Sequence, residues 1–134
     1  MSRAEQLVQR AVIQHLRWRG APGLFAFHPA NGGWRSAAEA KIFKSLGVAA
    51  GVPDIIVIYA GQCFGLELKA ERGRLTPPQL AVHELMRLTG AHVSTAHGID
   101  QALEQLEAWH LLRRTDGKGA RRASAATQAQ STDQ

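Results

Sequence analysis

Two hydrophobic segments, residues 55–59 and 63–69, have charged residues at their ends whose types suit catalysis. Asp54 precedes the first segment, and Glu67 and Lys69 end the second. Both segments are rich in β-branched, aromatic and leucine residues, which predicts strands. Because few residues separate them, an antiparallel hairpin is the expected pairing. With a two-residue loop, the alternation of side chains places all three charged groups on one face.

The loop of this hairpin sets which side chains become neighbours. If residues 60–61 form the loop, Asp54 lies opposite Glu67. If residues 61–62 form it, Asp54 lies opposite Lys69 with Glu67 diagonal to it, and the loop then begins with the glycine that a type II′ turn prefers. Opposite neighbours lie about 5 Å apart and diagonal ones about 7 Å apart. A three-residue loop would turn one strand over and separate the groups.

Two opposed carboxylates repel each other unless a cation lies between them. Because we expect no His or Cys side chain beside the two carboxylates, the donors are hard oxygens, which suit Mg²⁺ or Mn²⁺ rather than zinc. Such an ion can bind a phosphate oxygen and lower the pKa of water, and Lys69 can orient that water or offset negative charge. The other interpretation is a solvated hairpin face on which Glu67 and Lys69 offset each other. The opposite face is apolar and suits a covered core: Ile55, Val57, Phe64, Leu66 and Leu68.

The motifs resemble those of a known nuclease superfamily. Gly51-Val52-Pro53-Asp54 followed by Glu67-Leu68-Lys69 is similar to the PD-(D/E)XK signature. A wider ordered set resembles the virus-type replication-repair nuclease (VRR-NUC) domain in its short stand-alone phage and bacterial form. That set spans residues 4–110 and comprises Glu5, Gln9, His28-Pro29-Ala30-Asn31-Gly32, Gly47, Gly51-Val52-Pro53-Asp54, Glu67-Leu68-Lys69 and Gln79.

The resemblance implies a role for each matched residue. Asp54 and Glu67 would bind the divalent metal, Lys69 would be the catalytic lysine, and Glu5 would supply a further acidic group. Gln79 would be the family's glutamine after the ExK strand. Two of these residues have an equally good structural interpretation, since Glu5 suits the first turn of a helix and Gln79 suits the third position of a capping box.

The resemblance also implies an activity, which is metal-dependent endonuclease cleavage of DNA with Mg²⁺ or Mn²⁺, selective for branched or four-way junction substrates. It further implies a homodimer. The alternative function is a non-catalytic nucleic-acid-binding module that keeps the fold. Asn31 and Gly32 match the family's NG pair or form an ordinary tight turn. Basic residues that are candidate phosphate contacts or plain surface charges are Arg35, Lys41, Lys44, Arg72 and Arg74.

The elements that must position these residues follow from periodicity and capping signals. Helices are expected over residues 3–19, from Ser36 to about Gly47, from the Thr76 cap to about residue 89, and over 99–112, with His110 on the inward face of the last. Further strands are expected over residues 24–28 and 92–96. This order predicts an α/β fold with a small mixed sheet flanked by helices, as in the restriction-endonuclease-like PD-(D/E)XK core.

Composition limits the remaining possibilities. The chain has 134 residues, a net charge of +5 and the single cysteine Cys63, which excludes a disulfide framework and a multi-cysteine zinc site. It contains no long apolar run and no signal-peptide pattern, so we expect a cytoplasmic protein with no membrane partner. The basic balance favours an anionic partner such as DNA. We expect a nuclease domain over residues 1–114 and a disordered tail over 115–134.

Overall fold

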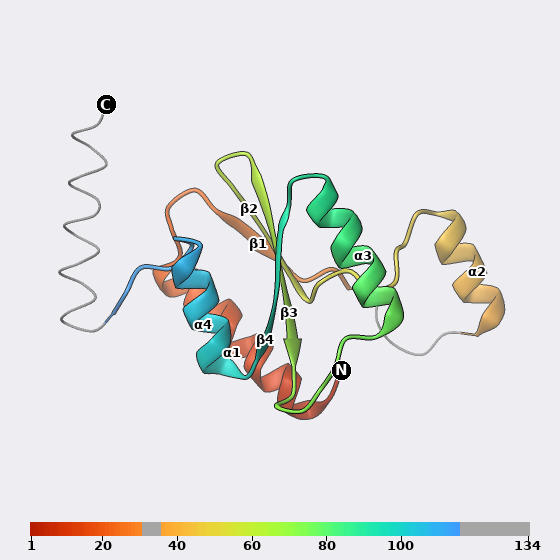
Figure 1. The fold of residues 1–134 in the computed structure, drawn as a ribbon, viewed down its shortest axis with the longest axis horizontal. Coiled ribbons are helices and arrows are strands. Elements are labelled where there is room, and N and C mark those ends of the chain that lie inside the picture. Colours follow the sequence, from red (N-terminus) through yellow and green to blue (C-terminus); the bar gives the residue numbers. More distant parts are fainter. Residues whose placement is uncertain (31–35, 116–134) are drawn as a thin grey trace.

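The computed structural model describes residues 1–30 and 36–115, and these residues form an α/β fold with a mixed sheet, which confirms the predicted class. The helices are α1 (Arg3–Arg19), α2 (Ala37–Ser45), α3 (Pro77–Leu88) and α4 (Ile99–Ala108) (Figure 1). The strands are β1 (Phe25–Phe27), β2 (Ile55–Tyr59), β3 (Gln62–Lys69) and β4 (His92–His97). Asn31, Gly32, Arg35 and the expected tail beyond Thr115 lie outside the described residues.

The four strands lie in the order β1-β2-β3-β4. The first three are antiparallel, whereas β4 runs parallel to β3 because α3 carries the chain back across the sheet between them. In the β2–β3 hairpin Tyr59 pairs with Gln62, so the loop is Ala60-Gly61. Both loop residues have positive φ, 51° and 75°, as a type I′ turn requires. Of the two expected registers, the one with residues 60–61 as the loop is therefore correct, and it sets Asp54 opposite Glu67.

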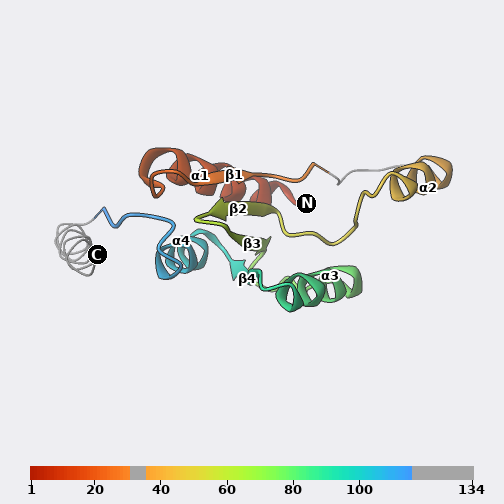
Figure 2. The same ribbon diagram turned by 90° about the horizontal axis from the view of Figure 1, so that it is seen from above.

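Helices α1 and α3 lie on opposite sides of the sheet (Figure 2). Side chains from α1 and α4 bury the apolar face of the hairpin, and Val12, Leu106 and Ile55 at its centre have no exposed surface. On the other face Pro53 and α3 cover Gly65, where an added Cβ would lie 2.7 Å from Pro53 Cγ and 3.3 Å from Met86 Cε. This close packing brings α3 over the face that carries Glu67.

Three helices begin at side-chain caps. The hydroxyls of Ser2, Ser36 and Thr76 each accept a hydrogen bond from a backbone N–H three residues later, which satisfies a free donor of the first turn. The caps at Ser36 and Thr76 confirm the sequence prediction. They fix where α2 and α3 start, and the Thr76 cap thereby places the first turn of α3 beside the end of the hairpin.

The prediction for the last helix was wrong in two respects. Helix α4 ends at Ala108, and His110 is exposed rather than inward, because its backbone turns with a φ of 63°. After this turn the buried Leu112 forms an isolated β-bridge with Gly20 at the end of α1. Helical periodicity continues through residue 112, but burial against α1 determines the backbone there.

Arg19 fixes α1 to this C-terminal segment. Its side chain is 5% exposed, and its Nη1 donates to Glu107 Oε1 at 2.9 Å and to the Arg113 carbonyl. Its Nε donates to His15 Nδ1 at 3.0 Å. A buried guanidinium is tolerated when its donors are paired in this way. These hydrogen bonds hold the C-terminal half of α1 against α4 and the segment after it. They thereby set the direction of the first turns of α1.

Helix α2 stands apart from the sheet in both views and buries none of its residues (Figures 1 and 2). Lys41 and Lys44 lie exposed on it. None of the helices in residues 1–30 and 36–115 has the length and apolar content that a membrane crossing requires.

Candidate active site

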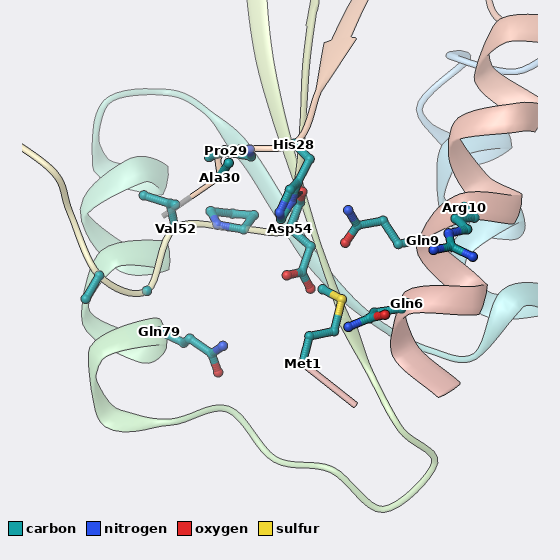
Figure 3. Close-up of a pocket in the computed structure, with 13 residues that line it drawn as sticks. Met1, Gln6, Gln9, Arg10, His28, Pro29, Ala30, Val52, Asp54 and Gln79 are labelled. Carbon is teal, nitrogen blue, oxygen red and sulfur yellow. Dashed lines mark hydrogen bonds between the residues drawn. The ribbon is translucent and has the colours of Figure 1, made fainter. Parts of the chain in front are cut away.

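A cleft of about 720 Å³ opens at the end of the β2–β3 hairpin that lies away from its turn. The N-terminal parts of α1 and α3 flank it, and the segments after β1 and before β2 complete its walls (Figure 3). The cleft is lined by Met1, Gln6, Gln9, Arg10, His28, Pro29, Ala30, Ala50, Gly51, Val52, Pro53, Asp54 and Gln79.

Asp54 lies one residue before β2, and the hairpin register carried one step further sets it opposite Glu67. Its carboxylate points into the cleft (Figure 3). The backbone N–H of Leu68 donates to Asp54 Oδ2 at 2.8 Å, which holds the side chain in place. His28 Nδ1 donates to the Asp54 carbonyl at 2.6 Å and ties the end of β1 to the same position. Asp54 is thus fixed from both sides.

Glu67 is a buried carboxyl with one unsatisfied oxygen. It is 2% exposed, and Gln79 Nε2 donates to its Oε1 across 3.4 Å. Its Oε2 is buried without a hydrogen-bond partner among the described residues. Burial is the main reason that the pKa of Glu67 rises to about 9. The hydrogen bond and negative charge of Asp54 raise it further, Lys69 opposes the rise, and Glu5 adds a smaller contribution.

His83 is a neighbour of Glu67 that the sequence analysis missed. Its side chain is fully buried, and its Nε2 lies 3.3 Å from Glu67 Oε2 without hydrogen-bond geometry. Burial, assisted by the charge of Arg87, lowers the pKa of His83, so the imidazole is neutral at pH 7. The expectation that no histidine lies near the carboxylates was wrong because nearness was judged along the sequence. The available signal was the four-residue spacing from Gln79, which places both side chains on one face of α3.

Gln79 serves both roles that its sequence context suggested. Its Oε1 accepts from the backbone N–H of Thr76 at 2.9 Å, which completes the capping box of α3. Its Nε2 faces Glu67 Oε1. One side-chain amide therefore stabilises the start of the helix and orients the buried carboxyl.

Gly51 lets the segment before Asp54 approach α3. Its φ is +89°, and an added Cβ would lie 2.5 Å from the carbonyl oxygen of Pro78. Gly47 has a similar φ of +92° but open space around the Cβ position. We expect Gly51→Ala to lower the free energy of unfolding by about 3 kcal/mol, since it adds a backbone clash to the strain of a left-handed residue.

The matched control is Gly47→Ala, which introduces the strain of a left-handed alanine without a backbone clash. We expect it to lower the free energy of unfolding by about 1 kcal/mol. Urea unfolding of both variants measures the difference. Equal losses in the two variants would show that the contact between Gly51 and Pro78 does not constrain the site.

The structure brings together Asp54, Glu67 and Gln79, and the charge of Lys69 acts on the same carboxyl. Glu5 is close enough to act electrostatically on Glu67. Within the described part of the chain, however, no three His, Cys, Asp or Glu side chains form a metal-binding group, so Glu5 as a third ligand stays a prediction. Among the predicted DNA contacts, Lys41, Lys44, Arg72 and Arg74 are exposed and none lines the cleft.

The sequence analysis also missed part of the cleft wall. Gln6 and Arg10, which it did not name, line the cleft from α1, beside His28 of the matched motif at the end of β1. Gln9, part of the matched motif, has a buried Oε1 without a hydrogen-bond partner among the described residues. The three- and four-residue spacing of these side chains on α1 was the usable signal.

This fold has counterparts among solved structures. One, described as a VRR_NUC domain protein, superimposes with a TM-score of 0.68 at 24% identity, covering 81% of this chain and 89% of its own. A second, described as a VRR_NUC domain, gives a TM-score of 0.57 at 24% identity and covers 81% of this chain and 99% of its own. The chain has the VRR_NUC fold. No protein-family model and no curated protein sequence matches it.

The VRR_NUC likeness spans most of both chains, so it concerns the whole architecture rather than a shared hairpin. It agrees with the resemblance in the motifs, because the cleft of this VRR_NUC fold contains the residues that carry that resemblance: Gln9, His28-Pro29-Ala30, Gly51-Val52-Pro53-Asp54 and Gln79.

Proposed function

We propose that the protein is a divalent-metal-dependent nuclease of the VRR-NUC family that hydrolyses phosphodiester bonds in DNA. The observation that carries the proposal is the pair of carboxyls at the hairpin end. Asp54 points into the cleft, while Glu67 next to it is buried with one oxygen unsatisfied. A stable fold avoids such an arrangement unless a cation compensates for it.

The donor set suits Mg²⁺ or Mn²⁺. Asp54 and Glu67 would hold the ion, with Glu5 as the further acidic group, and all three donors are hard oxygens. The raised pKa of Glu67 fits this role. The buried carboxyl needs a positive partner, and without a metal ion a bound proton takes that place. The chemistry that such an ion supplies when bound is charge neutralisation at the scissile phosphate and acidification of water.

The surrounding residues position these groups. Leu68 N–H and Gln79 Nε2 hold the two carboxyls in place, as supporting hydrogen bonds do in metal sites. Lys69 places a positive charge beside them, where it offsets the charge that develops on the phosphate and orients the attacking water. His83, neutral and buried behind Glu67, keeps water away from that side of the carboxyl.

The nuclease is proposed to act on branched or four-way junction DNA as a homodimer. The support is the basic charge of +5 and the family resemblance. A two-fold dimer places two identical clefts on paired strands of like polarity, so each protomer makes one cut. The oligomeric state is measurable by sedimentation at the concentrations used for cleavage.

The direct test incubates the full chain with linear duplex, single-stranded, flap and four-way junction DNA. We expect cleavage in Mg²⁺ or Mn²⁺, none in EDTA, and recovery when the metal is restored. Preferential cutting of the junction would support the structure selectivity. Binding without cutting in both metals would contradict the nuclease and favour the non-catalytic nucleic-acid-binding module.

A further inference from the structure

The imidazole of His83 is fully buried on the inner face of α3, where it lies against the carboxyl of Glu67. Its Nε2 is 3.3 Å from Glu67 Oε2. Neither ring nitrogen has a hydrogen-bond partner among the described residues, and the facing carboxyl oxygen has none either. Buried polar atoms normally have partners, so two adjacent ones without any indicate that another state of the site joins them.

The two carboxyls of the site are held by different parts of the chain. Asp54 accepts from the backbone N–H of Leu68, within the hairpin. Glu67 is flanked by two side chains of α3, because Gln79 Nε2 faces its Oε1 across 3.4 Å and His83 Nε2 faces its Oε2. These two residues are four positions apart, so they reach over the same part of β3. Each carboxylate oxygen has two lone pairs, so both contacts leave positions for a cation.

An imidazole carries a proton on at least one nitrogen, and its surroundings decide which one. The backbone of Gly51 and the carboxyl of Glu67 both act on the His83 ring. A proton directed at Gly51 leaves the lone pair of Nε2 facing Glu67, which is repulsive when Glu67 is the ionised carboxylate that a metal ion requires. A proton on Nε2 instead forms a charge-assisted hydrogen bond with that carboxylate.

We propose that His83 is a positioning residue for Glu67, and that its Nε2–H donates to Glu67 Oε2 when the divalent ion is bound. This deepens the proposed nuclease function and rests on it. The hydrogen bond fixes the orientation of the carboxylate and stabilises its charge, so the site binds the ion more tightly. Supporting hydrogen bonds of this kind change metal affinity by about 10- to 100-fold. His83 acts on the ion only through Glu67.

Two substitutions of similar shape separate the hydrogen bond from packing. His83→Gln brings an amide N–H toward Glu67 on an unbranched side chain, whereas His83→Met fills the space with a side chain of similar length that has no donor. Metal affinity is measured on the full chain without DNA, from the EPR signal of free Mn²⁺ in a titration. We expect His83→Met to weaken Mn²⁺ binding about tenfold or more and His83→Gln to remain close to wild type. Equal affinities in the two variants would overturn the proposal.

Met86→Leu is the matched control, because Met86 lies three residues further along α3 and packs over Gly65 rather than against the carboxyl. It alters the contact of the helix with the sheet, so its Mn²⁺ affinity should equal that of wild type. Thermal unfolding in EDTA checks that each variant is folded. A tenfold loss of affinity in Met86→Leu would show that metal binding follows the packing of α3 and not the hydrogen bond from His83.

The wild-type chain offers a measurement that does not depend on any variant. Long-range ¹H–¹⁵N spectra of ¹⁵N-labelled protein show which ring nitrogen of a histidine carries the proton. With saturating Mg²⁺ we expect the proton of His83 on Nε2. A bare Nε2 in the presence of bound Mg²⁺ would overturn the proposal, because the ring would then have no proton to donate to Glu67.

These measurements separate the role of His83 from the nuclease activity. Mn²⁺ affinity that depends on the donor at position 83, with no cleavage of any DNA substrate, would retain the positioning role and refute the nuclease. Metal-dependent cleavage, with equal affinities in His83→Met and His83→Gln, would retain the nuclease and refute the positioning role. A wild-type chain that binds neither Mn²⁺ nor Mg²⁺ would contradict both.

Discussion

Replacing Asp54 by Asn is expected to reduce metal-dependent cleavage of DNA by about a thousandfold or more, with the fold intact. Asparagine has the shape of aspartate, and its Oδ1 can still accept the Leu68 N–H that now reaches Asp54 Oδ2. The change therefore removes a negative charge from the cleft and little else. Without that charge the pair no longer neutralises a divalent cation, so the chemistry that depends on the ion is lost.

Single-turnover cleavage of the best substrate, compared with thermal unfolding of the same sample, measures this effect. Asp100→Asn is the matched control, because Asp100 is an exposed aspartate in the first turn of α4, outside the cleft. We expect wild-type rates for the control. Wild-type rates in Asp54→Asn would place the catalytic carboxyl elsewhere in the chain.

Glu67→Gln is expected to stabilise the metal-free protein at alkaline pH. The folded chain keeps the Glu67 proton up to a pKa of about 9, whereas the unfolded chain loses it near the ordinary value of 4.5. Between these values the folded state binds more protons than the unfolded state, so the free energy of unfolding falls as pH rises. Glutamine carries no titrating proton, so it should remove this loss and be more stable than wild type by about 5 kcal/mol at pH 8.5.

Thermal unfolding in EDTA from pH 4 to pH 9 measures the effect, and the two melting curves should converge toward pH 4. A gain of this size corresponds to roughly 10 °C or more in Tm. Glu104→Gln, at an exposed position of α4, should follow the wild-type profile. Adding Mg²⁺ should stabilise the wild type and leave Glu67→Gln unchanged, since ligand binding to the folded state raises its stability. If the Tm of wild type and of Glu67→Gln changed with pH in parallel, Glu67 would not keep its proton in the folded chain.

Much of the fold could be predicted because its signals are local. Ser36 and Thr76 cap helices through their own hydroxyls, and the hydrophobic runs of β2 and β3 are β-rich and short. The shared face of Asp54 and Glu67 followed from strand alternation together with a two-residue loop. The position of Gln79 followed from the capping box, since the third residue of that box must point back toward the start of the helix.

Other features depend on contacts between distant segments. Local turn preference pointed to a glycine at the first loop position, yet Ala60 takes it with a positive φ. That conformation costs an alanine roughly 1–2 kcal/mol, a penalty that the pairing of a whole hairpin can offset. The burial of His83 against Glu67 joins α3 to β3, and the turn at His110 brings Leu112 back to α1. No short window of sequence contains these contacts.

The two-residue turn at Ala60-Gly61 lies about 17 Å along the strand from Asp54. Surface turns are normally where chains accept insertions with least harm. Here a change that shifted one strand against the other by one position would make Asp54 and Glu67 face opposite sides of the sheet. The length of this turn therefore determines whether the two carboxyls meet at the cleft. A deletion or insertion that shifts this register would separate the two carboxyls, although it lies at the far end of the hairpin from them.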